Sequence, residues 1–309
     1  MGYKKPIKIV LALGIGAIVL YYIVQTLIQN ADQLREYEFV FRSDFLIVSF
    51  VLLLVSHIFL PLIWKRILSC FNVNVGYADA LEILFLSYLA RYIPGKVFTV
   101  VSQVGLAKEK QISMEVSLTT AVIYQLLGVF VGFEVFILTF ILWPEVALSL
   151  KATAVAAGLI VLIISTRTGV IVRLVKFAIR RIKGSDAIFE LSGRESLRLQ
   201  GFLLISWIWY AVALHFLLNA FAEMPFVNTL IIMGIQAISW LISYYVLIAP
   251  GGIGVREGVQ IIMLKKLFLP TLSVLIPVVL RLWMTMGDVL IFLVGLGVRY
   301  GRRAKRPVL

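Results

Sequence analysis

Residues 227–269 form an apolar run with a break in its middle: VNTLIIMGIQAISWLISYYVLIAPGGIGVREGVQIIMLKKLFL. A helix needs about 20 apolar residues to cross the hydrocarbon core of a bilayer, and Val227–Ala249 is long enough to do so. Pro250, Gly251 and Gly252 then end the helix, because proline removes a backbone donor and glycine permits a tight turn. We therefore expect helical segments inside a membrane, separated by non-helical backbone.

A weaker copy of this pattern lies earlier in the chain, where Pro94 and Gly95 separate Ala80–Ile93 from Val97–Ala107. After each break a new half-helix begins, and its first turn presents free N–H groups and the positive end of its dipole. Non-helical backbone at membrane depth is tolerated only where protein or a water-filled cavity surrounds it. We expect two re-entrant hairpins. The alternative is that each broken stretch crosses the membrane twice, which gives eight spans.

The composition places the whole chain in lipid. Of its 309 residues, 61% are hydrophobic and 15% are charged, whereas a soluble domain has roughly 45–50% apolar and about 25% charged residues. This excludes a soluble globular protein. One cysteine and two histidines exclude a disulfide scaffold and a Cys/His metal cage, so we expect no metal and no cofactor. The net charge of +13 indicates membrane topology and anionic headgroups, not nucleic acid.

Continuous apolar segments predict six transmembrane helices in addition to the two broken stretches. They are Ile7–Ile28, Phe45–Trp64, Met114–Trp143, Val146–Thr166, Gly201–Ala222 and Thr271–Val298. The first follows three lysines, as in a signal peptide, but no small-x-small cleavage site follows it, so we interpret it as an uncleaved anchor. The predicted fold is an all-α polytopic membrane protein that forms a single transmembrane domain over residues 1–309.

The distribution of basic residues predicts the orientation. If the N-terminus lies in the cytoplasm, most of the 29 basic residues fall on the cytoplasmic side, as the positive-inside rule requires. Those that fall outside are Arg35, Arg42, Lys151, Lys265 and Lys266. Both termini are then cytoplasmic, in the cell (plasma or inner) membrane. A re-entrant hairpin and a hairpin that spans twice both return the chain to the side from which it entered. The charges therefore do not separate these two alternatives.

The chain resembles itself after a shift of 156 residues. The matched pairs are Ser87-Tyr88 with Ser243-Tyr244, Pro94-Gly95 with Pro250-Gly251, Lys110 with Lys266 and Ser117 with Ser273, and a shift of 158 brings His57 onto His215. With the orientation above, residues 45–143 and 201–299 are inverted repeats, an architecture typical of transporters. Chance similarity between two apolar, proline-containing stretches is the alternative.

The repeat divides the remainder of the chain. Residues 1–44 are predicted to hold the anchor helix and an external loop, and residues 300–309 a basic cytoplasmic tail. Residues 144–200 hold a linking helix and a basic cytoplasmic segment. In that segment, basic residues recur at helical spacing among apolar ones: Arg173, Lys176, Arg180 and Lys183. This predicts an amphipathic helix on an anionic leaflet.

The two breaks are the predicted substrate-binding site. A helix N-terminus together with cationic side chains suits a phosphate group. The candidate binding residues are Arg91, Pro94, Gly95, Lys96, Pro250, Gly251, Gly252, Gly254, Arg256 and Glu257. The alternative is a pair of structural kinks whose arginines extend to the interface.

Polar residues within the apolar segments predict a translocation path. The candidates are Tyr88, Gln103, Gln125, Glu134, Tyr244, Arg281 and Asp288. Charges at membrane depth are costly and therefore candidates for function, and Arg281 and Asp288 lie on one face of a helix. We expect them to form a polar seam with Glu134, or with Arg256 and Glu257. Structural ion pairs between helices are the alternative.

Two motifs carry a resemblance to a known family. Tyr92-Ile93-Pro94-Gly95-Lys96, followed by Gly105-Leu106-Ala107-Lys108, resembles the first hairpin of the lysylphosphatidylglycerol synthase transmembrane (flippase-like) family. Ala249-Pro250-Gly251-Gly252-Ile253-Gly254-Val255-Arg256-Glu257-Gly258 resembles its second, more specific motif. The resemblance covers nearly the whole chain. Phe98-Thr99 replaces a glycine-acidic pair that many members show, so the resemblance does not imply a particular headgroup.

The best-known members of that family join a flippase domain to a soluble aminoacyl-transferase domain. These 309 residues contain no such domain, so the resemblance implies a stand-alone lipid or lipid-linked-sugar translocase without synthase activity. We expect movement of an anionic phospholipid, aminoacyl-phospholipid or polyprenyl-phosphate-linked lipid between leaflets. The alternatives are an intramembrane enzyme that modifies lipid headgroups, with Glu257, Asp288 or His57 as the base, and a non-catalytic membrane subunit.

The expected partners follow from this function. They are the transported membrane lipid and an anionic leaflet, with either a second copy of the chain or a separate lipid-modifying enzyme as a protein partner. Nucleic acid is not expected.

Overall fold

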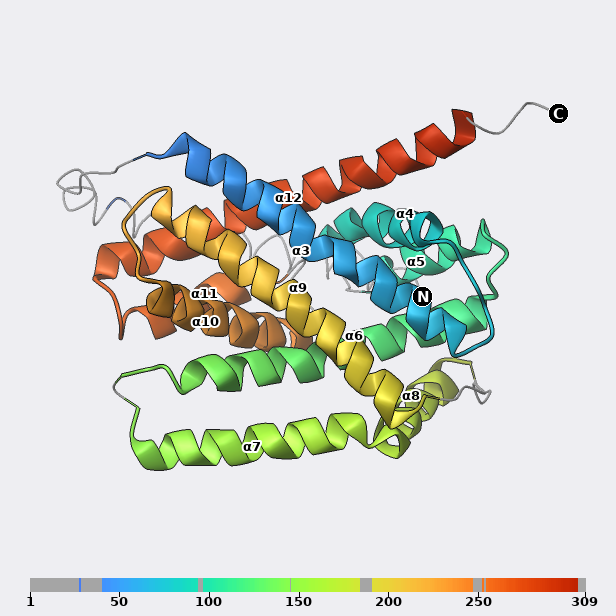
Figure 1. Ribbon diagram of the computed structural model, residues 1–309, viewed down its shortest axis with the longest axis horizontal. Coiled ribbons are helices and arrows are strands. Elements are labelled where there is room, and N and C mark those ends of the chain that lie inside the picture. Colours follow the sequence, from blue (N-terminus) through green and yellow to red (C-terminus); the bar gives the residue numbers. More distant parts are fainter. Residues whose placement is uncertain are drawn as a thin grey trace, which may run out of the picture.

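The computed structural model describes residues 41–93, 97–144, 146–183, 191–246 and 254–304, together with Ile28 and Gly252. Within these ranges every regular element is a helix, as predicted (Figure 1). The predicted anchor helix and much of both chain breaks lie outside the described residues. The binding-site candidates outside them are Pro94, Gly95, Lys96, Pro250 and Gly251.

The helices follow one another with short connections. Their bounds are α3 Ser43–Ser69, α4 Tyr77–Ser87, the 3₁₀ helix η1 Tyr88–Tyr92, α5 Phe98–Lys108, α6 Met114–Phe140, α7 Leu148–Thr166, α8 Thr168–Lys183, α9 Gly193–Asn219, α10 Phe226–Tyr245, α11 Val255–Leu264 and α12 Pro270–Ala304. Serine caps fix two of the starts: Ser113 accepts a hydrogen bond from Val116 N, and Ser192 accepts one from Glu195 N. α8 is the helix predicted from the spacing of basic residues, and its buried face carries Ile171 and Val175.

Six described helices are long and apolar enough to cross a bilayer: α3, α6, α7, α9, α10 and α12. They confirm an all-helical, multi-pass membrane protein. Five of them match predicted spans, and the sixth, α10, belongs to the second broken stretch. α10 has 20 residues, so it extends about 30 Å. In contrast, α4 and α5 have 11 residues each and extend about 16 Å, which is half of the hydrocarbon core.

Two helices extend well beyond their predicted apolar cores. α3 continues to Ser69, and α9 begins at Gly193, inside the segment that was predicted to be a basic linker. A hydropathy pattern predicts only the part of a helix that lies in lipid. It does not predict the charged end turns of these helices. Arg66 of α3 and Glu195 of α9 form an ion pair there, with Nη1 3.1 Å from Oε1.

The two halves of the chain exchange their last helices. α3 packs along α9, while α6 of the first half packs on α10 and α12 of the second half packs on α4 (Figure 1). The same shift of 156 residues that aligns the sequences carries α5 onto 254–264, and α11 is Val255–Leu264. The inversion of one half relative to the other across a membrane stays a prediction.

Glycine permits the close approach of the exchanged helices. A Cβ atom on Gly234 of α10 would overlap Thr139 of α6, and one on Gly287 of α12 would overlap Leu53 of α3. In a membrane, where lipid tails compete with apolar side chains, such close packing of small residues is a main source of helix association. α7 lies at the edge of the bundle beyond α6 and is almost entirely exposed (Figure 1).

Candidate functional site

A cavity of about 320 Å³ lies where the two halves meet. Each half contributes its first helix, its broken stretch and its last helix to the wall. Tyr88 and Tyr244, which the sequence repeat pairs, both line it. Four lining positions of α3 (Leu53, Ser56, His57, Leu60) correspond to four of α9 (Leu203, Ser206, Trp207, Tyr210) after a shift of 150 residues.

A pair of serines in the cavity wall joins the helices α3 and α9. Ser206 Oγ donates a hydrogen bond of 2.7 Å to the carbonyl oxygen of Ser56. With these helices matched in this way, His57 corresponds to Trp207 and not to His215. His215 instead interacts with Thr229 and Asn219, away from the cavity. The shift of 158 that pairs the two histidines in the sequence is therefore not the shift that relates the cavity-lining positions of α3 and α9.

An ion pair in the cavity wall joins the first broken stretch to α12. Arg91 Nη1 lies 3.4 Å from Asp288 Oδ2, and the side chain of Asp288 is only 7% exposed. The hydroxyl of Tyr92 donates to the same carboxylate oxygen at 2.8 Å. The guanidinium of Arg91 also lies over the ring of Tyr88, 4.2 Å from its centroid. Asp288 is therefore satisfied by groups of the protein, and its partners come from the residues just before the first break.

A second ion pair lies beside the cavity and fixes the start of α11. Glu257 Oε2 accepts a hydrogen bond of 2.6 Å from the backbone N–H of Gly254, while its other oxygen lies 3.5 Å from Arg281 Nε. Gly254 has φ = 88°, a conformation that suits glycine. Glu257 is thus occupied as a helix cap, and neither it nor Arg281 lines the cavity.

Arg256 is the cation of the wall that the described residues do not neutralise. It follows the first residue of α11 and lines the cavity. Its Nε is buried and has no hydrogen-bond partner, and no carboxylate of the described chain forms an ion pair with it. With Arg91 balanced by Asp288, the described wall has one positive charge in excess. Arg256 is only partly exposed, and a charge with reduced solvation and no counterion is costly, so the cavity favours an anion.

Neutral polar groups extend from the cavity into the second half. Gln236 of α10 donates to the hydroxyl of Tyr210 at 3.1 Å and also contacts Gln260 of α11. Gln260 donates to Ser239 Oγ at 3.1 Å. These side chains are hydrogen-bonded to one another, and they hold α11, with Arg256 at its start, against α9 and α10.

The cavity brings together most of the predicted site residues that are described: Tyr88, Arg91, Gln103, Gln125, Tyr244, Gly252, Arg256 and Asp288. Gly254, Glu257 and Arg281 lie beside it as described above. Glu134 does not line it, although its side chain is buried within α6. Of the two alternatives predicted for Arg281, the structure shows the pairing with Glu257.

The sequence does not predict the aromatic part of the wall or the contact of Tyr92 with Asp288. The wall includes Tyr124, Trp207, Tyr210 and Trp240. Aromatic residues in membrane helices also gather at the interfaces, so composition alone does not mark them as cavity residues. The repeat shift of 156 residues aligns Trp240 with Leu84, an apolar residue that also lines the cavity.

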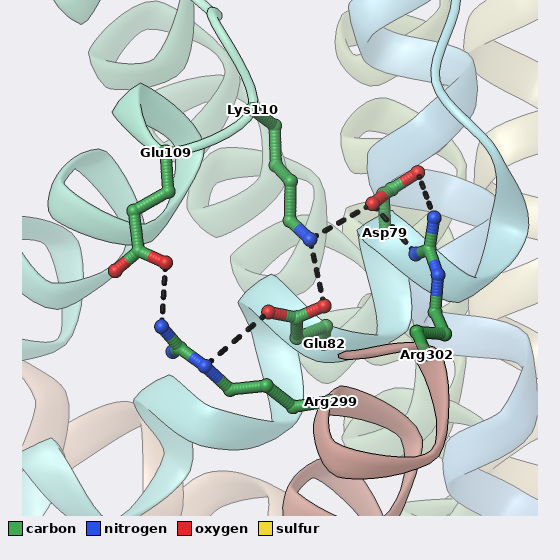
Figure 2. Close-up of polar contacts among 6 residues, drawn as sticks. All are labelled: Asp79, Glu82, Glu109, Lys110, Arg299 and Arg302. Atoms are coloured by element: carbon green, nitrogen blue, oxygen red, sulfur yellow. Dashed lines mark hydrogen bonds and ion pairs between the residues drawn. The ribbon is translucent and has the colours of Figure 1, made fainter. Parts of the chain in front are cut away.

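A network of six charged residues lies at the end of the bundle that the charge pattern predicts to be cytoplasmic (Figure 2). Lys110 lies between Asp79 Oδ1, at 3.0 Å, and Glu82 Oε2, at 2.7 Å. Arg302 of α12 donates to Asp79, and Arg299 bridges Glu82 and Glu109. Figure 2 shows that the network ties α4 and the connection after α5 to the last turns of α12.

Burial raises the pKa of Asp79, but the hydrogen bonds from Arg302 and Lys110 together lower it by a larger amount. The pKa of this carboxyl therefore lies below its usual value. Asp79 is therefore held in its charged form near neutral pH. Sequence analysis did not single it out, because its members are far apart in the chain and each half of it resembles an ordinary solvated helix end.

The described residues contain no group of three or more histidine, cysteine or acidic side chains that could hold a metal ion. Among protein families, the model of the lysylphosphatidylglycerol synthase TM region matches residues 9–295. No curated protein and no solved structure matches the chain.

Proposed function

Since the chain belongs to the lysylphosphatidylglycerol synthase TM region family, we propose that it is a lipid translocase, which moves an anionic lipid between the leaflets of a membrane. The observation that carries the proposal is Arg256 in the cavity wall, a cation that no described carboxylate neutralises. The phosphate of the lipid headgroup would bind this guanidinium, as phosphate binds arginine elsewhere.

The physical task of a translocase is to remove the cost of moving a charged headgroup through hydrocarbon, which is large for an unpaired ion. A polar cavity at the meeting of two helix bundles does this, while the acyl or polyprenyl tails stay in lipid. α5 has the two faces that this arrangement needs, one toward the polar cavity and one toward the lipid tails. Its buried residues are Gln103 and Ala107, while Phe98 and Val101 are exposed.

The substrates in question are anionic phospholipids, aminoacyl-phospholipids and polyprenyl-phosphate-linked lipids, which share the phosphate that the cavity favours. The chain has no nucleotide-binding motif, so the proposal includes downhill exchange or coupling to an ion gradient. It includes no chemistry on the headgroup. In the proposed orientation both termini lie in the cytoplasm, and the network of Figure 2 lies on the cytoplasmic side.

Leaflet exchange in vesicles tests the proposal. Purified protein is reconstituted into phosphatidylcholine vesicles that contain a trace of acyl-labelled fluorescent phosphatidylglycerol, and an impermeant quencher reports the lipid that reaches the outer leaflet. We expect exchange well above that of protein-free vesicles. Arg256→Gln removes a charge-assisted contact worth roughly 1.5–3 kcal/mol, so exchange should fall by a factor of about 10 to 100.

The matched control is Arg173→Gln, which removes an exposed arginine of α8, outside the cavity. It should exchange lipid as the wild type does. If the wild type matches protein-free vesicles, or if Arg256→Gln matches the wild type, the proposed function is wrong.

A further inference from the structure

Gln103 is a buried amide in the cavity wall that lacks a partner for its acceptor. It lies on the inner face of α5 and its side chain is 3% exposed. Its oxygen, Oε1, has no hydrogen-bond partner among the described residues. Buried polar atoms are nearly always hydrogen-bonded, and each exception in a folded protein calls for an explanation.

The other fully buried amides near the cavity do not share this feature, and Gln125, which also lines the cavity, is only partly buried. Gln236 and Gln260 are both hydrogen-bonded in the network described above, and Gln200, which is buried at the far end of α9, interacts with Ser165 and Ser196. An amide oxygen is an acceptor only, so a donor must come to it. The terminal torsion of glutamine is broad, which lets the amide turn toward a ligand in the cavity.

A phosphate group alone does not satisfy this wall. The oxygens of a phosphodiester accept hydrogen bonds from Arg256, and they also accept from the amide nitrogen of Gln103. They have no proton to donate to the amide oxygen. A headgroup that fills the cavity and displaces water would therefore leave Gln103 Oε1 unpaired, unless the alcohol beyond the phosphate carries a donor of its own.

We propose that the cavity selects lipids whose phosphodiester is joined to an alcohol with a hydrogen-bond donor, and that Gln103 is the residue that recognises this donor. This inference rests on the proposed function and names the chemical class of its substrate. The phosphate binds Arg256 of the second half, and the donor of the headgroup binds Gln103 of the first half. Both halves of the chain then contribute to one bound lipid, in agreement with a cavity that both halves line.

Two lipids of equal charge test this selection. Phosphatidylglycerol carries hydroxyl donors on a three-carbon alcohol, and phosphatidylpropanol carries the same three carbons without them. In the vesicle assay, we expect the wild type to exchange phosphatidylglycerol about ten times faster than phosphatidylpropanol, which corresponds to one buried acceptor left unpaired.

Gln103→Leu keeps the approximate size of the side chain and removes the amide. It should reduce this ratio to about one, by slowing phosphatidylglycerol and not phosphatidylpropanol. Ser102→Leu is the control, because it makes a polar-to-apolar change on the same helix outside the cavity lining. Its ratio should equal that of the wild type.

The outcomes separate the two proposals. If neither lipid moves faster than in protein-free vesicles, the proposed function is wrong and the selection is wrong with it. If both lipids move at equal rates in the wild type, translocation stands and the selection is overturned, without the use of any variant. If the wild-type ratio is large and Gln103→Leu retains it, Gln103 is not the selecting residue.

Discussion

The ion pair between Arg91 and Asp288 should couple the first broken stretch to α12 energetically, and a double-mutant cycle measures that coupling. At 3.4 Å, the attraction between unit charges is about 5 kcal/mol for an effective dielectric constant near 20. The Arg91 side chain is 35% exposed, and both charges lose solvation, so only part of this attraction remains. We expect a coupling free energy of about 2 kcal/mol.

The cycle uses Arg91→Gln, Asp288→Asn and the double variant, each of which keeps a polar side chain of similar shape. Arg91→Gln should be the more destabilising single change, because it leaves the carboxylate of Asp288, whose side chain is only 7% exposed, without its counterion. The double variant should recover part of that loss. Chemical unfolding in detergent micelles, followed by tryptophan fluorescence, gives the four free energies of unfolding.

The control cycle uses Arg66 and Glu195, whose atoms approach to 3.1 Å but whose side chains are 42% and 18% exposed. Exposed ion pairs contribute roughly 0–1 kcal/mol, so this coupling should be the smaller of the two. Additive effects of Arg91→Gln and Asp288→Asn would refute the reasoning, since the two side chains would then not interact in the folded protein.

Three further predictions concern stability. Gly234→Val should lower the melting temperature in detergent by several degrees, because its side chain would overlap Thr139 and separate α10 from α6; an unchanged melting temperature would contradict the packing. The stabilisation from the depressed pKa of Asp79 should be present above its unfolded pKa and be lost as the pH falls through its folded pKa. Thermal unfolding between pH 7 and pH 2 should therefore show a smaller acid-induced loss in Asp79→Asn than in the wild type, and equal losses would argue against the bonds from Arg302. Glu257→Gln should cost about 1 kcal/mol, since it weakens the charged cap of α11, and a cost near zero in chemical unfolding would show that Gly254 N–H is satisfied otherwise.

The spans were predictable because hydrophobic length is a property of contiguous residues. Met114–Trp143 corresponds closely to α6, and Val146–Thr166 to α7. The starts and ends of helices were predicted less well wherever the helix leaves the lipid, as at Gly193 of α9. There the sequence turns polar while the backbone continues as a helix, and only the capping serine Ser192 marks the true start.

The site was predictable as a set of residues and not as a set of contacts. Chain breaks and buried charges identified Arg91, Arg256 and Asp288 as members of it. Their pairing was not accessible, because Arg91 and Asp288 are 197 residues apart. The nearer cation on the same helix, Arg281, instead faces Glu257.

Glu134 was predicted to belong to the translocation path but does not line the cavity. A polar residue in an apolar helix has the same sequence signature whether it faces a cavity, another helix or a hydrated interface.

Binding of phospholipid to Arg256 is the central claim, and native mass spectrometry of the protein released from detergent micelles tests it most directly. With phosphatidylglycerol added, the wild type should retain bound lipid, and Arg256→Gln should retain far less, while Arg173→Gln matches the wild type. Equal retention of phosphatidylglycerol by the wild type and Arg256→Gln would contradict the account, because the lipid phosphate would then bind somewhere other than the cavity.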